Sequence, residues 1–195
     1  MPLFSCFQCG AQFPESPTPP QRCPICDDER QFVSWDGQKW LSREELIATH
    51  RVVWHDDLGV PGVGIEPSFA IGQRALLLRE ADGCVMWDCI PLATEAAIAY
   101  VRSLGGLKAI AVSHPHYYGA LADWSAAFGD APVYLHAADS AWVTRIACGS
   151  PRTFCWCAAA GISPAARCCI GAPGRKGAAR CSPAISQQLR WTDGF

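Results

Sequence analysis

The sequence LKAIAVSHPHYYG, residues 107–119, sets a short apolar run directly before two closely spaced histidines. The run predicts a buried strand over 107–113. His114 and His116 then follow the C-terminal end of that strand, where both side chains can point into one site. The His-x-His spacing is equally typical of a pair of loop or core histidines, so the flanking sequence has to decide between these readings.

On both sides of this stretch, the sequence predicts strands that first pair locally and then alternate with helices. A capping box formed by Ser42 and Glu45 opens a helix that ends near His50. Short strands are expected at 32–35 and 133–135, a hairpin at 68–79 and 84–88, and helices at 95–104, capped by Thr94, and at 119–128. This order predicts an α/β layer structure.

Two Cys-x-x-Cys knuckles, CFQCG at 6–10 and CPICD at 23–27, lie near the start of the chain. Two thiolates on one tight turn can reach the same metal ion, and two such turns complete a tetrahedron. The spacing therefore predicts one structural zinc, held by Cys6, Cys9, Cys23 and Cys26 in a zinc ribbon over 1–35. A rubredoxin-like iron site and four reduced loop cysteines are the alternatives.

The composition limits the classes of protein to which this chain can belong. The net charge of −2 speaks against a nucleic-acid-binding surface. We find neither a long apolar run nor a signal-peptide pattern, so we expect a cytoplasmic protein without a membrane partner. Thiols stay reduced in that compartment, which favours metal ligation over disulfides for many of the twelve cysteines.

The sequence changes character near Arg145. Acidic residues outnumber basic ones before that point, whereas Asp193 is the single acidic residue after it. Residues 146–195 are rich in Ala, Gly, Pro, Arg and Cys, and show neither helix periodicity nor strand alternation. We therefore expect three parts: the ribbon at 1–35, an α/β domain at 36–145 and an irregular tail at 146–195.

Residues 1–145 resemble the metallo-β-lactamase-fold hydrolases, and more narrowly a bacterial group with a zinc ribbon ahead of the hydrolase domain. The resemblance rests on IEPSFAIGQR (65–74), VMWDC (85–89), IAVSHPHYY (110–118) and WSAAFGDAPVYLHAAD (124–139). It implies that residues 36–145 are the first half of an αββα sandwich. It also implies a zinc-bound water that attacks a small-molecule ester, thioester, lactone or phosphoester.

The metal motif of that family is His-x-His-x-Asp-His. His114 and His116 match it and are the candidate ligands of a second, catalytic zinc, but Tyr118 and Gly119 stand where the Asp and the last His belong. Tyr118 is therefore the candidate catalytic residue, because a phenol can donate a hydrogen bond to an oxyanion. A phenol is a poor base near neutral pH, so even this half departs from the hydrolytic pattern.

The sequence gives less specific predictions for the other acidic and imidazole side chains. His136 follows a strand and is expected to pack or to support a ligand rather than to bind metal. Asp88 ends a strand, where either a place near the cleft or a strand-end cap fits. His50 and His55 are expected at the surface or between domains.

The composition of the tail suggests translation out of frame. In a shifted frame, the codons of 161–171 permit HFPGGTVLHW and those of 177–186 permit RGALLSGDI, which resemble the third-histidine turn and the bridging-Asp strand of the family. A natural basic, cysteine-rich tail that binds a partner or a second metal is the rival reading.

Three functions follow from these patterns. The chain is a metallo-β-lactamase-fold hydrolase-like protein, or the inactive product of a disrupted gene, or a non-enzymatic zinc-ribbon interaction module. We combine the first two: the family is hydrolytic, and this chain lacks the third His and the bridging Asp.

Overall fold

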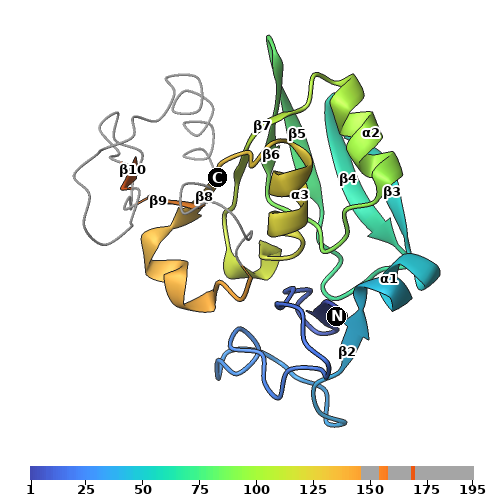
Figure 1. Ribbon diagram of the computed structural model, residues 1–195, viewed down its shortest axis with the longest axis vertical. Coiled ribbons are helices and arrows are strands. Elements are labelled where there is room, and N and C mark those ends of the chain that lie inside the picture. Colours follow the sequence, from blue (N-terminus) through green and yellow to red (C-terminus); the bar gives the residue numbers. More distant parts are fainter. Residues whose placement is uncertain (146–153, 158–167, 170–195) are drawn as a thin grey trace.

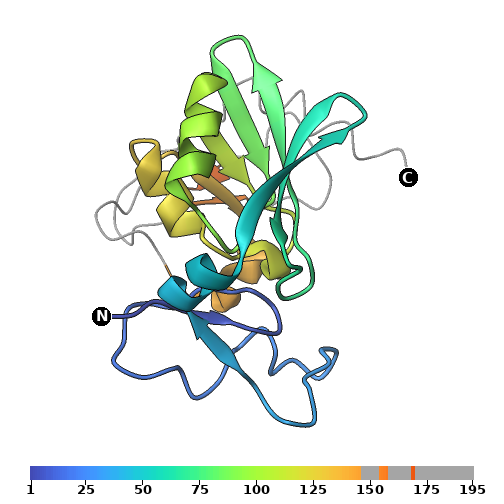
Figure 2. The same cartoon turned by 90° about the vertical axis from the view of Figure 1, so that its right-hand side faces the viewer.

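The structure, a computed structural model, describes residues 1–145, 154–157 and 168–169 (Figure 1). A small N-terminal cysteine module, residues 1–42, lies below a larger α/β layer (Figures 1 and 2). The elements of the layer are α1 (Arg43–Thr49), β3 (Arg51–Asp57), β4 (Val60–Glu66), β5 (Ala75–Glu80), β6 (Gly83–Trp87), α2 (Glu95–Ser103), β7 (Leu107–Ala111), η1 (Pro115–Tyr117), α3 (Leu121–Ala127), β8 (Val133–His136), η2 (Ala137–Trp142), β9 (Phe154–Cys157) and β10 (Cys168–Cys169).

The cysteine module contains a two-stranded antiparallel sheet of β1 (Phe4–Cys6) and β2 (Trp40–Ser42). The strand expected at 32–35 does not form. Phe32 and Trp35 remain 67% and 97% exposed, and β1 pairs with β2 instead. The module therefore extends beyond the expected boundary at residue 35, to the strand that leads into α1.

The main sheet has the order β10-β9-β8-β7-β6-β5-β4-β3. Strands β3 to β6 pair antiparallel, and β6 to β9 pair parallel. Helix α2 lies in the crossover from β6 to β7, and α3 lies in the crossover from β7 to β8. Local pairing followed by alternation of strands and helices is the predicted order, so the mixed α/β class is confirmed. The parallel half brings the C-terminal ends of β6 and β7 to one edge of the sheet.

The hairpin of β3 and β4 was not predicted, and the strand expected at 68–79 begins only at Ala75. Strand β4 carries Gly62 and Gly64, residues that usually weaken a strand. A Cβ at Gly62 would collide with the Asp57 carboxylate, and one at Gly64 would lie 3.1 Å from the His55 ring. The glycines therefore leave room for side chains of β3, a need that the sequence pattern does not reveal.

Two strands lie within the segment in which no strand was expected. Strand β9 pairs in parallel with β8, and β10 pairs antiparallel with β9. The sequence of β9, FCWC, is a continuous apolar run, which parallel strands tolerate because they need no alternation. The other residues of the expected irregular tail lie outside the described residues. The same holds for the two segments interpreted as out of frame, except for Cys168 and Cys169.

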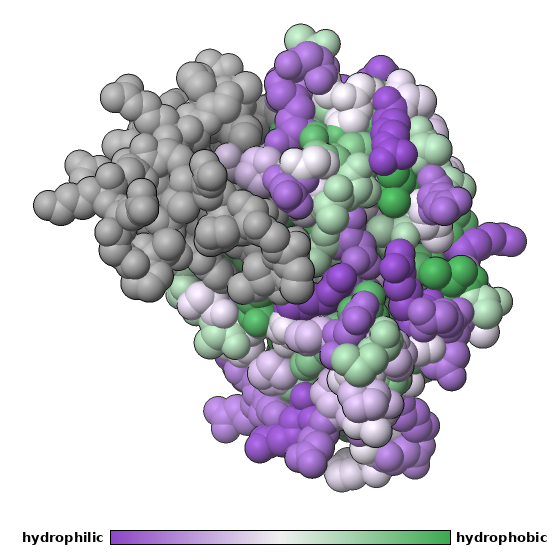
Figure 3. Space-filling model, viewed as in Figure 1, coloured by the Kyte–Doolittle hydropathy of each residue, from purple (hydrophilic) through white to green (hydrophobic). Residues whose placement is uncertain are grey.

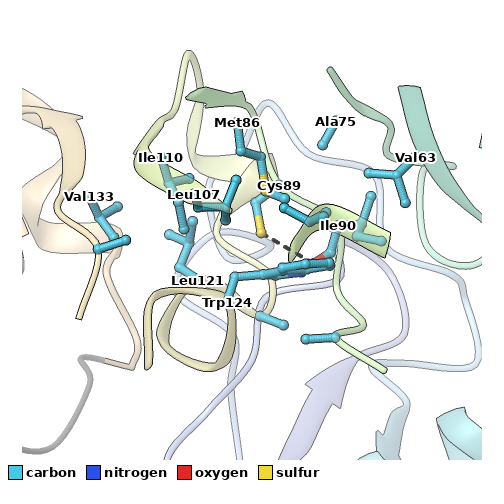
Figure 4. Packing of buried hydrophobic residues seen from close by; sticks show 14 of the residues in the cluster. Val63, Ala75, Met86, Cys89, Ile90, Leu107, Ile110, Leu121, Trp124 and Val133 are labelled. Atoms are coloured by element: carbon cyan, nitrogen blue, oxygen red, sulfur yellow. Dashed lines mark hydrogen bonds between the residues drawn. The ribbon is translucent and has the colours of Figure 1, made fainter. Parts of the chain in front are cut away.

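Helices α2 and α3 cover one face of the sheet (Figure 2). Their buried side chains, Ala97, Val101, Leu121 and Trp124, pack on inward-facing residues of the strands. Figure 4 shows Ile110, Leu121 and Trp124 gathered around Cys89, whose thiol donates to the Ile90 carbonyl. The predicted capping box holds, since Glu45 N–H donates to the Ser42 hydroxyl and the Glu45 carboxylate accepts from Ser42 N–H.

The surface of the cysteine module is largely hydrophilic in the view of Figure 3. Across the described ranges, we find no helix that combines the length and the apolar character needed to cross a membrane.

Gly119 provides a test of how tightly the turn after β7 is packed. A Cβ there would lie 2.7 Å from Pro91 Cα and 2.8 Å from Pro91 N. Because backbone atoms cannot move aside easily, Gly119→Ala should lower the free energy of unfolding by about 2–3 kcal/mol in urea titrations. Gly59→Ala meets no atom within 4 Å and should cost about 1 kcal/mol, from its left-handed backbone alone. Equal losses in the two variants would contradict this packing.

Candidate metal centre and histidine cavity

The four predicted cysteines come together in one buried cluster. The Sγ atoms of Cys6 and Cys26 are 3.7 Å apart, those of Cys9 and Cys23 are 3.5 Å apart, and all four lie within 4.8 Å of one another. Four sulfurs placed 2.3 Å from a zinc ion at tetrahedral angles would be separated by about 3.8 Å. The cluster can therefore hold a metal ion such as zinc.

Matching turns bring the sulfurs together. Gly10 N–H donates to the Cys6 carbonyl at 2.8 Å, and Asp27 N–H donates to the Cys23 carbonyl at 2.9 Å. Gly10 adopts φ +77°, a left-handed conformation that favours glycine. The left-handed backbone of Gly10 therefore closes the turn after the first knuckle.

The thiols also share hydrogen bonds. The contact with Cys23 holds the pKa of the Cys6 thiol well below its usual range, whereas the same partner raises the pKa of Cys9. Such opposed shifts arise where several thiols compete for few protons in a buried site. A bound cation removes this competition because it favours the thiolate form of all four ligands.

One buried glutamine joins the first knuckle to the histidine turn. The Gln73 amide nitrogen donates to the Cys9 carbonyl at 2.6 Å and to the His116 carbonyl at 2.8 Å. Gln73 is only 5% exposed, and a Cβ at Gly10 would lie 2.8 Å from its amide nitrogen. The glycine therefore also allows the close approach of this side chain.

His114 and His116 lie together at a cavity of about 400 Å³ between the cysteine module and the α/β layer. Their rings stack with centroids 4.7 Å apart and planes 24° apart. His114 Nδ1 accepts from His116 N–H at 3.2 Å, and His116 Nε2 lies 2.9 Å from the Gln31 amide oxygen. The predicted pair is thus brought to one site.

The cavity has walls from both parts of the protein. The lining residues are Ile25, Asp28, Arg30, Gln31, His114, Pro115, His116, Asp139 and Trp142. The Arg30 guanidinium donates two hydrogen bonds of 2.7 Å to the Asp28 carboxylate. Among residues 1–145, the histidine pair has no third His, Cys, Asp or Glu close enough to complete a metal cluster, whereas the four cysteines form one.

Tyr118, the candidate catalytic residue, does not face the cavity. Its side chain belongs to the core below the sheet and is 3% exposed, and burial raises the pKa of its hydroxyl. Packing in the core accounts for Tyr118 in this structure, and the oxyanion role expected for it stays a prediction.

Asp88 fixes the backbone just before the histidines. Its Oδ1 accepts from both the backbone N–H and the hydroxyl of Ser113, each at 2.8 Å. Asp88 is 7% exposed and has φ +64°. Asp88 therefore caps the backbone next to His114 and also lines a cavity, so both interpretations left open for it remain.

A second cavity, of about 510 Å³, lies on the other side of the histidine turn. Asp88, Tyr117, Arg74 and His55 are among its lining residues. Asp88 and Arg74 act on the pKa of Tyr117 in opposite directions, although burial is the main reason why that pKa is raised. His55, expected at the surface or between domains, is exposed and is one of the residues that line this cavity.

The remaining histidines have local roles. His136 Nδ1 accepts from Ala138 N–H at 3.2 Å and so caps η2, and the role in packing or ligand support expected for it stays a prediction. His50 contacts the Thr49 hydroxyl at 2.7 Å and packs edge-on against Phe69.

Sequence reasoning missed two site residues, Gln31 and Gln73. Neither belongs to a spacing pattern, and glutamines are common in exposed loops. The GQR segment around Gln73 supported the family resemblance but carried no sign that its amide bridges two parts of the protein.

No protein-family model and no solved structure matches this chain. The chain is 39% identical over 148 residues to "Uncharacterized protein YmaE" of Bacillus subtilis (strain 168). The match covers 74% of this chain and 54% of YmaE, so the chain spans about half the length of that relative.

The metal cluster leads to a stoichiometry prediction. The purified chain should contain one zinc, and Cys9→Ser should lose it together with part of the thermal stability, because the metal supplies folding free energy to a small module. Cys84→Ala, which removes a buried thiol outside the cluster, is the matched control and should keep the zinc. Elemental analysis and thermal unfolding measure both effects. Retention of the full zinc content by Cys9→Ser would refute the assignment.

Asp88 leads to a pH prediction. Burial raises the pKa of its carboxyl above the ordinary value, although the Ser113 hydrogen bonds lower it in part. The folded state therefore keeps this proton to higher pH than the unfolded state, and the wild type loses stability as pH rises from about 4. Asp88→Asn abolishes that loss, so its stability relative to wild type should increase between pH 4 and 7 in urea titrations.

Asp130→Asn changes an exposed aspartate that also has positive φ, and it controls for the effect of Asn on such a backbone. If the difference in unfolding free energy between wild type and Asp88→Asn stays constant with pH, the pKa of Asp88 is not raised in the folded state.

Proposed function

We propose that residues 36–145 form the first half of a metallo-β-lactamase-type hydrolase domain, preceded by a structural zinc ribbon, and that this chain itself lacks hydrolytic activity. One observation carries the proposal. Neighbouring parallel strands β6 and β7 end in Asp88 and in the Ser113–His116 turn, and Asp88 holds that turn through Ser113. Ligands of α/β sheets bind outside the carboxyl ends of such strands.

The chemistry expected there belongs to the intact family. A zinc ion held by His114, His116 and a third histidine would lower the pKa of a bound water towards 7 and polarise the scissile bond of an ester, thioester, lactone or phosphoester. The residues of this chain would contribute the imidazoles and the fixed turn. The Asp28–Arg30 pair at the wall of the cavity offers polar contacts to a small-molecule substrate.

Three observations support the lack of activity. The described residues offer no third ligand beside the histidine pair. At the positions of the missing ligands, the Tyr118 side chain is buried in the core and Gly119 packs against the Pro91 backbone. In this structure His114 Nδ1 accepts from the His116 backbone N–H at 3.2 Å, so a hydrogen bond occupies the lone pair that a metal ion would need at this nitrogen.

An out-of-frame tail requires that part of this chain matches no relative, and the match to YmaE covers 74% of the chain. A tail read out of frame would be unrelated to any relative, whereas a natural extension shared with relatives would be matched. Sequencing the gene around codons 143–150 tests this directly.

A zinc-ribbon interaction module is the second candidate function. The exposed aromatic side chains of Phe32 and Trp35 on the cysteine module favour it, because large apolar groups at a surface are typical of contact sites. This candidate predicts one zinc in every version of the chain.

Restoring the frame after codon 145 separates the two candidates. The chain as given should contain one zinc and hydrolyse no member of a panel of ester, thioester, lactone and phosphoester substrates. The frame-restored product should bind a further zinc and hydrolyse at least one of them, and a His114→Ala/His116→Ala version should lose both gains. One zinc and no hydrolysis in the frame-restored protein would favour the interaction module.

A further inference from the structure

Gln31 connects the cysteine module to the histidine pair. It follows the second knuckle by five positions, and its backbone N–H donates to the Asp28 carbonyl at 2.9 Å, closing a turn. Its side chain then reaches across the cavity, where the amide oxygen lies 2.9 Å from His116 Nε2. The wall of the cavity thus makes a polar contact with one of the two imidazoles.

The chemistry of this contact determines where the proton of the imidazole lies. An amide oxygen can only accept, so His116 Nε2 must donate, and a neutral imidazole has one N–H. The lone pair of His116 is therefore on Nδ1. We propose that Gln31 is a positioning residue, which fixes the tautomer and the orientation of His116 so that Nδ1 is the nitrogen offered to a divalent metal ion in the cavity. The metal in this statement rests on the proposed function, whereas the tautomer does not.

The backbone of the same histidine is held by the other knuckle. Gln73 donates to the His116 carbonyl and to the Cys9 carbonyl with one amide group. The second knuckle therefore orients the ring of His116, and the first knuckle fixes its main chain. Outer hydrogen bonds of this kind orient metal-binding imidazoles and set their protonation. The cysteine module is in this sense part of the histidine site rather than an appendage.

The tautomer can be measured by long-range ¹H–¹⁵N NMR of the imidazoles of the full chain at pH 8, where the neutral ring predominates. Wild type should show His116 protonated on Nε2. Gln31→Leu removes the acceptor and should give a mixture of both tautomers, whereas Gln31→Glu keeps an acceptor and should restore the wild-type pattern. Gln21→Leu, the same change at an exposed glutamine, should have no effect. Rescue by Glu distinguishes positioning from a loss of structure.

Two results would overturn the role of Gln31: protonation of His116 on Nδ1 in wild type, or an unchanged tautomer in Gln31→Leu. Zinc added beyond the first equivalent tests the metal separately. It should shift the Nδ1 signal of His116, with an affinity about 10-fold or more weaker in Gln31→Leu. Absence of any second zinc in wild type would overturn the metal part of this proposal and leave the proposed function, which expects one zinc in the purified chain, unaffected. The tautomer result would still decide the role of Gln31.

Discussion

The mutual approach of four buried thiols is the constraint on which the N-terminal part of the structure depends. Their Sγ atoms lie within 4.8 Å of one another, an arrangement that is costly for protonated thiols and favourable around a cation. The described module has long loops, two short strands that flank the cysteine segments, and a small apolar cluster around the thiols, so the cysteines are central to its shape. The loop that carries Asp28, Arg30 and Gln31 takes its position from the second knuckle, and one wall of the histidine cavity is therefore positioned by the cysteines.

The opposite wall depends on a different kind of interaction. Asp88 and Gln73 are buried polar side chains whose hydrogen bonds are directed at backbone atoms on both sides of His114 and His116. Burial of a carboxylate and of an amide costs stability unless such bonds compensate for it. The protein accepts this cost where the chain leaves β7, and the result is a turn whose geometry is fixed before any ligand binds.

Features with a local cause could be predicted from the sequence, and those with a tertiary cause could not. The knuckle spacing, the Ser42–Glu45 capping box and the alternation of strands and helices depend on residues close in sequence. The β3–β4 hairpin was missed because Gly62 and Gly64 are explained only by side chains on the facing strand. Gln31 and Gln73 were missed because an amide has no spacing rule, and the burial of Tyr118 was not predicted because a sequence does not show which side of a turn faces the core.

The packing around Tyr118 and Gly119 also limits what this site can become. A side chain at position 119 would meet the backbone of Pro91 at 2.7–2.8 Å, and position 118 is filled by a ring that belongs to the core. Replacing these two residues by Asp and His would therefore disturb the fold before it added ligands. Any zinc in the cavity must draw on His114, His116 and residues outside this turn. The departure from the His-x-His-x-Asp-His pattern is thus built into the packing of the domain, and it is consistent with at most one metal ion beside the histidine pair, whatever follows Arg145.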